Sequence, residues 1–107
     1  MVESAIENGF EVYKAVAVST GHLSPDDIRL FEEFVDTKAS NMVTKRSTGF
    51  FLKLYGELEK DQREEYSSTL NRIISMALES GALVIEFDAD AIVVDGLPCY
   101  EGDYDNA

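Results

Sequence analysis

The chain has 107 residues, of which 45% are hydrophobic and 28% are charged, values typical of one globular domain rather than a disordered segment. No apolar run approaches the roughly 18 residues of a membrane span, and the N-terminal segment lacks the basic-then-apolar pattern of a secretory signal. Twenty-one acidic residues against nine basic ones give a net charge of −12, which disfavours nucleic acid and membranes and favours basic partners. Solubility alone is the other explanation of this charge. The single cysteine, Cys99, cannot form an internal disulfide, so we expect a cytoplasmic protein.

The first half of the chain predicts a strand, a helix and a further strand. Residues 10–18 are mostly apolar and are predicted to form the first strand. A helix follows, with Ser24 as its N-cap and two aspartates in its first turn, and runs to about Lys38. Residues 43–45 form either a short strand or an irregular loop. Residues 49–55 alternate as a strand, with the even-numbered side chains on one face and the odd-numbered ones on the other.

The clearest helix is predicted in the second half of the chain. Asp61 is its expected N-cap and Glu64 the capping-box residue, and the helix runs through Ser80. Gly81 stands where a left-handed C-cap glycine belongs. The core-facing residues repeat at helical spacing: Tyr66, Leu70, Ile73, Ile74, Ala77 and Leu78.

Two strands complete the pattern. Residues 82–87 and 91–94 are predicted to be strands joined by a hairpin loop at residues 88–90. The order β-α-β-α-β-β predicts a small α+β domain with two helices packed on one face of a mainly antiparallel sheet. The whole chain forms this single domain, with fraying expected in residues 1–9 and 103–107.

Three segments carry a resemblance to a known family: "VSTGHLSPDD" after the first strand, "TGFFLKL" in mid-chain, and "ALESGALVIEFDADAIVVDGLPCYEGD" at the end. Together they resemble a family of small uncharacterised acidic proteins carried by plasmids, phages and integrative elements. Its members share a Ser-Thr-Gly/Ala-His step, an aromatic mid-chain strand, and an Asp-x-Asp turn before an Asp-x-Leu-Pro-x-Tyr segment. The resemblance spans about residues 16–103. It implies a mobile-element origin and no particular activity.

Clustered carboxylates near the C-terminus suggest a divalent cation site. Glu86, Asp88, Asp90 and Asp95 offer the hard oxygen ligands that such a cation prefers. An EF-hand loop would need an oxygen ligand at position 92 and a glycine at position 93, where isoleucine and valine stand. Aspartates that close a tight turn are the simpler interpretation, so we expect neither a metal nor a cofactor.

A cysteine nucleophile with His22 as its base is the main enzymatic alternative. Such a site needs surroundings that favour the thiolate, but Cys99 lies in the most acidic part of the chain. Ser19 and Thr20 are interpreted as turn and cap hydroxyls, and His22 as a structural or surface residue. We therefore expect no catalytic residues.

The C-terminal acids and tyrosines form the predicted partner-binding site. The chain has no basic residue beyond Arg72, and its tyrosines alternate there with acids. This pattern places carboxylates at phosphate-like spacing beside aromatic anchors. The alternative is that the tyrosines complete the core while the acids stay solvated. The predicted site residues are Glu86, Asp88, Asp90, Asp95, Tyr100, Glu101, Asp103 and Tyr104.

The sequence therefore predicts a non-enzymatic acidic binding protein from a mobile element or phage. Its expected role is to inhibit a basic nucleic-acid-handling host protein or nucleoprotein complex, as an anti-CRISPR or anti-restriction factor does, by nucleic-acid mimicry or steric blocking. Direct contact with nucleic acid or membranes is not expected. One alternative is a regulatory or interaction module, antitoxin-like or homodimeric, with an unrelated protein partner. Another is a small hydrolase or metal-dependent enzyme.

Overall fold

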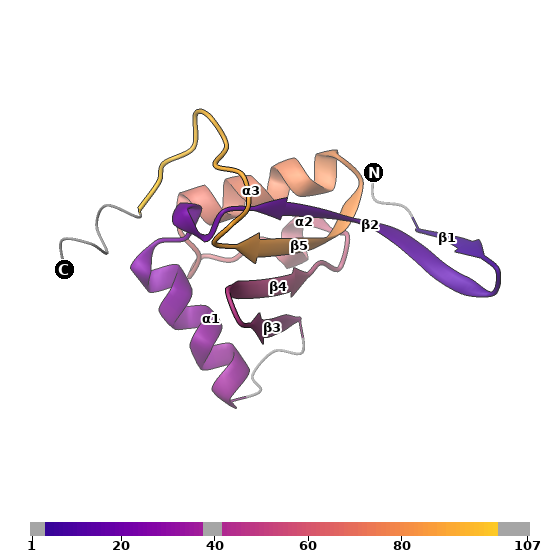
Figure 1. Cartoon of the computed structure of the whole chain (residues 1–107), viewed down its shortest axis with the longest axis horizontal. Helices are drawn as coiled ribbons and strands as arrows, with labels where there is room; N and C mark the ends of the chain where they lie inside the picture. The colour runs from indigo at the N-terminus through magenta and orange to yellow at the C-terminus, as the bar shows by residue number, and fades with distance from the viewer. Residues whose placement is uncertain (1–3, 38–41, 101–107) are drawn as a thin grey trace.

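The computed structural model describes residues 4–37 and 42–100, which form one small α+β domain (Figure 1). The predicted fold class is confirmed. No helix in these ranges is long and apolar enough to cross a membrane. The elements in chain order are β1 (Ser4–Glu7), β2 (Phe10–Val18), the 3-10 helix η1 (Thr20–His22), α1 (Pro25–Thr37), β3 (Val43–Arg46), β4 (Gly49–Lys53), α2 (Leu58–Asp61), α3 (Ser68–Glu79) and β5 (Ala82–Asp88).

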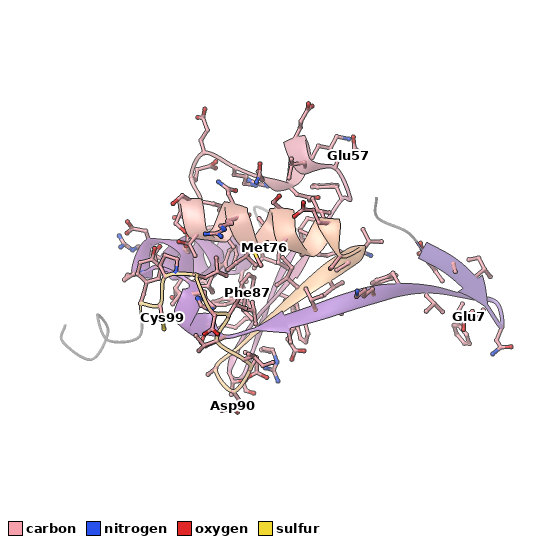
Figure 2. The ribbon with its side chains drawn as sticks, turned by 90° about the horizontal axis from the view of Figure 1, so that it is seen from above. Glu7, Glu57, Met76, Phe87, Asp90 and Cys99 are labelled. Atoms are coloured by element: carbon pink, nitrogen blue, oxygen red, sulfur yellow. The ribbon has the colours of Figure 1, made fainter. Side chains whose placement is uncertain are left out.

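The strands form one mixed sheet in the order β1-β2-β5-β4-β3. β2 and β5 run parallel, whereas the other three neighbouring pairs are antiparallel. The helices lie on one face of this sheet, and no described helix covers the other face (Figures 1 and 2). A mainly antiparallel sheet with helices packed on one face is thus confirmed.

The core lies between the helices and the sheet. Phe31 of α1 packs edge-on against Phe50 of β4, with 5.3 Å between ring centroids, and against Tyr66 at 5.8 Å. Phe87 of β5 lies 5.9 Å from the Phe31 ring. The alternation predicted for the middle strand is confirmed, because the even-numbered residues of β4 are buried beneath the helices.

The start of α1 follows the sequence prediction. The Oγ of Ser24 accepts a hydrogen bond from the Asp27 N–H at 3.1 Å, and the Asp27 carboxylate accepts one from the Ser24 N–H at 3.2 Å. This reciprocal pair is a capping box, which satisfies two N–H groups that have no partner inside the helix.

The predicted N-terminus of the long second helix is wrong. Asp61 ends the short helix α2, and α3 begins at Ser68 with Ser67 as its N-cap, whose Oγ accepts from the Leu70 N–H at 3.1 Å. The predicted C-terminus holds, because Gly81 has a φ of 87°. Asp61 is buried and closes the turn after β4 instead. Its carboxylate accepts the N–H groups of Tyr55 at 2.8 Å, Gly56 at 3.0 Å and Glu57 at 3.2 Å.

The predicted strand at residues 91–94 is also wrong. The expected turn at residues 88–90 forms and is closed by a 3.0 Å hydrogen bond from the Ala91 N–H to the Asp88 carbonyl. The chain then crosses the end of β2, where the Ile92 carbonyl accepts from the Ser19 N–H at 2.9 Å. Because the Ile92 carbonyl bonds to the loop after β2, residues 91–94 form no strand ladder with β5.

A hairpin that the sequence analysis did not predict precedes the body of the domain. β1 pairs antiparallel with the first half of β2, from Ser4 opposite Tyr13 to Glu7 opposite Phe10. The turn residues Asn8 and Gly9 have φ values of 53° and 84°, as a two-residue type I′ turn requires. We call residues 4–13 the arm, and Figure 1 shows it projecting away from the helices.

Candidate functional site

The residues after β5 form an irregular segment, residues 89–100, that His22 holds against the body. The Nδ1 of His22 lies 2.6 Å from the Pro98 carbonyl oxygen, and its Nε2 lies 2.8 Å from the Val94 backbone nitrogen. The Tyr100 N–H also donates to the Gly21 carbonyl at 2.6 Å. The segment that carries three of the eight predicted site residues, Asp90, Asp95 and Tyr100, is therefore fixed in place by the turn before α1.

The chemistry of these contacts sets the state of the His22 ring. A carbonyl oxygen can only accept, so Nδ1 carries the proton and donates to Pro98. A backbone N–H can only donate, so Nε2 is the unprotonated acceptor for Val94. The ring is fully buried and both nitrogens are engaged. His22 is a structural residue, which was one interpretation of the sequence. It holds residues 89–100, a segment far from it in the sequence, rather than its own turn.

The geometry does not assemble a cysteine nucleophile with its base. Cys99 is exposed, and it follows the proline whose carbonyl binds His22. Since both nitrogens of His22 bond to backbone groups, neither is free to take a proton from the thiol.

Two of the predicted partner-binding carboxylates are already paired. Arg46 of β3 lies 2.7 Å from Asp88 and 3.4 Å from Glu86. Asp88 also accepts hydrogen bonds from the Asp90 N–H at 3.0 Å and the Thr48 hydroxyl at 2.9 Å. The Asp90 amide, the Thr48 hydroxyl and the Arg46 guanidinium together hold the pKa of Asp88 below its ordinary value. The first part of the predicted site therefore closes a turn, and Arg46 compensates one of its two negative charges.

The other predicted residues divide into exposed and docked side chains. Asp90 and Asp95 are exposed and form no ion pair within residues 4–37 and 42–100. Tyr100 is half-buried, and its hydroxyl lies 3.2 Å from the Thr69 hydroxyl at the start of α3. Tyr100 thus helps to complete the fold. The remaining predicted residues, Glu101, Asp103 and Tyr104, lie outside the described residues.

The described carboxylates do not gather into a metal centre. Within the ranges that the structure covers, no group of three or more histidine, cysteine, aspartate or glutamate side chains could hold a metal ion. Asp88 and Asp90 lie on one turn, but the Asp88 carboxylate is occupied by its hydrogen bonds and by Arg46.

A buried carboxylate that the sequence analysis placed only in the first helical turn links the two long helices. Asp27 has no exposed surface. Besides capping α1, it accepts from the Ser67 N–H at 2.8 Å and from the Ser67 hydroxyl at 2.5 Å. Because Ser67 is the N-cap of α3, one carboxylate serves the N-termini of both helices. The Ser-x-x-Asp spacing before α1 was the available signal, but it could not reveal the second helix.

The helix-free face of the sheet presents aromatic and small side chains. Tyr13 and Phe51 are each 38% exposed there, and each lies under a cation. Lys53 Nζ is 5.1 Å from the centre of the Tyr13 ring, and Arg46 Cζ is 5.7 Å from that of Phe51. The strand register places Ala15 and Ala17 of β2 on the same face, opposite Val84 and Glu86 of β5. This face therefore presents two partly exposed aromatic rings beside two alanines.

Exposed carboxylates are spread over the rest of the molecule rather than confined to its C-terminal third. They lie on the arm, on all three α-helices, in the loop before α3 and in the segment after β5. Those with no ion pair to any described residue are Glu7, Glu11, Glu33, Asp36, Glu59, Glu64, Glu65, Glu79, Asp90 and Asp95.

These features define a small α+β protein with a mainly apolar core, a few buried polar side chains that are hydrogen-bonded, an acidic exterior and one sheet face that no described helix covers. The chain belongs to the family described as "Family of unknown function (DUF5983) C-terminal domain", whose model matches residues 15–102. No curated protein and no solved structure matches the chain. The family match begins within β2, so the arm precedes the matched region.

Proposed function

We propose that this chain is a non-enzymatic acidic binding protein, encoded by a phage or another mobile element, that inhibits a basic nucleic-acid-handling host protein. It acts as an anti-CRISPR or anti-restriction factor would, by mimicking nucleic acid or by blocking a basic groove. The setting is cytoplasmic, in keeping with the single exposed cysteine. The observation that carries this proposal is the set of exposed carboxylates without an ion pair.

The balance of charges supports a basic partner. Four basic residues form the ion pairs seen in the described chain: Arg29, Lys45, Arg46 and Lys60. Lys53 and Arg63 lie over aromatic rings instead. Few cations are thus left to screen the acids, and the resulting field attracts a basic surface over about one screening length, roughly 8 Å at physiological salt.

The structure changes which residues of the predicted site are offered to a partner. Asp90 and Asp95 remain as exposed, unpaired acids. Glu86 and Asp88 must separate from Arg46 before they can meet a partner, which costs energy. In this proposal the exposed acids of the 89–100 segment provide the local contact, and the acids on the helices provide long-range attraction.

Matched charge variants test the proposal. The protein is used to capture partners from a host lysate, and the captured protein is purified for affinity measurements. Asp90→Asn with Asp95→Asn removes two charges from the segment, whereas Glu33→Gln with Asp36→Asn removes two from α1. We expect the first pair to weaken binding about tenfold or more and the second pair to weaken it only slightly.

The salt dependence of binding and the displacement of nucleic acid are the remaining tests. Affinity for the captured protein should fall steeply as salt rises, and the protein should displace nucleic acid from it. Affinity unchanged by salt and by both variant pairs would remove the charge-based proposal.

The open sheet face favours a second candidate, an interaction or regulatory module with an unrelated partner. Tyr13 and Phe51 are aromatic anchors of the kind that dominate protein interfaces. Capture of a non-basic protein, lost on Phe51→Gln but not on Asp90→Asn, would favour this module over the acidic inhibitor.

A further inference from the structure

The outer edge of β2 lacks a neighbouring strand along part of its length. β1 pairs with residues 10–13 only, and β5 pairs with residues 14–18 on the opposite edge. Within the described chain, no strand therefore lies beside the outer edge of residues 14–18. Such an edge presents backbone N–H and C=O groups to any strand that approaches it.

An apolar groove runs beside this free edge, between β2 and α3. Its volume is about 210 Å³, and Met76 on its α3 side is 40% exposed. Figure 2 shows Met76 and Asp90 on opposite sides of the β2 ribbon, so the groove faces away from the Asp90 turn. The apolar side chains that line it include Val16, Val18, Ile73, Val94 and Leu97.

Exposed apolar side chains also lie at both ends of the free edge. At one end the arm carries Ile6 and Phe10, which are 72% and 73% exposed. At the other end, beside Ser19, Ile92 is 76% exposed and Val93 is 48% exposed. A two-stranded ribbon is marginally stable in water, so the arm gains from a contact that covers it.

We propose that a second copy of this chain pairs antiparallel with the free edge of β2, about a two-fold axis near Val16. Antiparallel pairing reverses the second strand, so the arm of each copy reaches the Ile92 end of the other. The two grooves meet at the axis and cover Met76 of both copies. The two sheets become continuous, with the helices of both copies on the same side.

The free edge of β2 is complementary to itself, so a second copy of the chain is the partner that fits it. A two-fold interface uses the same patch twice, so each feature on one side of the axis must meet its complement on the other. The β2 edge meets this condition, because the arm presents Phe10 at one end and Ile92 and Val93 are exposed at the other. Pairing of the short free edge alone would fall short of the roughly 800 Å² per copy of a specific interface, and the arms provide the additional area.

The salt dependence of this dimer separates it from the proposed inhibitor function. Each copy carries a net charge of −12, so repulsion opposes pairing and salt relieves it. Binding to a basic partner has the opposite dependence. Dimer formation can therefore fail while the inhibitor function stands, and the reverse also holds.

Analytical ultracentrifugation of the full chain, from micromolar to millimolar concentration, tests the proposal. Measurements at about 0.1 M and about 1 M salt span screening lengths of roughly 10 Å and 3 Å. We expect a monomer–dimer equilibrium whose dissociation constant falls at high salt. Phe10→Gln should raise that constant about a hundredfold, because the side chain is lost from both copies.

A second interface variant and a matched control complete the test. Met76→Gln should also weaken the dimer, whereas Tyr55→Gln should leave it unchanged, since Tyr55 is 55% exposed but follows β4, away from the free edge. A chain that stays monomeric under all these conditions overturns the proposal. A dimer that resists both Phe10→Gln and Met76→Gln, or that Tyr55→Gln weakens equally, also overturns it.

Discussion

Replacement of His22 by alanine is expected to release the 89–100 segment while the sheet and helices stay folded. The buried ring donates to the Pro98 carbonyl and accepts from the Val94 N–H, and each bond contributes roughly 1 kcal/mol net. Loss of the ring leaves a cavity that costs about 1–2 kcal/mol more. We therefore expect the free energy of unfolding to fall by about 3 kcal/mol, a large part of the roughly 5–15 kcal/mol typical of a domain.

Urea unfolding measures this loss, and amide hydrogen exchange locates it. The Val94 amide should exchange much faster in the alanine variant, whereas amides in β4 should change only with global stability. Two variants are matched controls: His22→Gln keeps an acceptor near the Nε2 position, and His22→Asn keeps a donor near the Nδ1 position. Val94 should therefore stay better protected with glutamine than with asparagine. Unchanged protection of Val94 in His22→Ala would refute the structural role of the histidine.

Three further predictions concern stability. A Cβ on Gly49 would lie 1.7 Å from the Phe87 carbonyl oxygen, so Gly49→Ala should lower the free energy of unfolding by more than about 4 kcal/mol. Gly96→Ala, whose Cβ meets no atom within 4 Å, should cost only about 1 kcal/mol from its positive φ, and equal losses in the two variants would contradict the steric argument. The pKa of Asp88 is lowered in the folded state, so its contribution is present above the ordinary value of 3.8 and is lost as the pH falls through the folded pKa. Asp88→Asn should therefore flatten the acid side of the stability profile measured by urea unfolding. Burial raises the pKa of Tyr66 to about 12, so its contribution is complete below pH 10 and is lost as the pH rises towards 12. Tyr66→Phe should remove that alkaline loss, and a phenolate absorbance step that persists near pH 12 in this variant would contradict the assignment.

Local signals predicted the parts of the fold whose partners are near in sequence. Ser24 caps a helix that starts one residue later, and Gly81 ends a helix through its own positive φ. The alternation of apolar and other side chains in β4 could be read from the sequence because only one face of this strand is buried. The Asn8–Gly9 turn was also a local signal for a hairpin, but the strand before it is short and its side chains are exposed, so periodicity did not reveal it.

Hydrogen bonds that the residue pattern does not reveal decided the parts that local reasoning missed. The apolar β-branched run at residues 91–94 suits a strand, yet its Val94 N–H bonds to His22, 72 residues earlier. Asp61 suits an N-cap, whose side chain accepts one N–H of the first helical turn, but in the structure its carboxylate accepts three N–H groups of the turn after β4. The candidate site was likewise predicted only in part. The acidity of the C-terminal third is plain in the sequence, whereas the pairing of Asp88 with Arg46 depends on how β3, β4 and β5 meet.

The two proposed interactions place opposite demands on the acids of the arm. Glu7 and Glu11 are exposed, and in the proposed dimer each arm lies against a second copy that is itself strongly negative. Glu7→Gln with Glu11→Gln should therefore tighten the dimer, while it lowers the attraction to a basic partner. The matched pair Glu33→Gln with Asp36→Asn removes the same charge from α1, which packs against β3 at the other end of the sheet.

Ultracentrifugation at about 0.1 M salt compares the two pairs where screening is weak. Only local repulsion at the β2 edge makes the arm pair act more strongly than the α1 pair on self-association. Equal effects would mean that net charge alone governs association, and the arm would then have no place in the interface. A larger effect of the arm pair would show that the acids near the edge restrain the dimer, so that a basic partner or added salt could shift the chain between its two complexes.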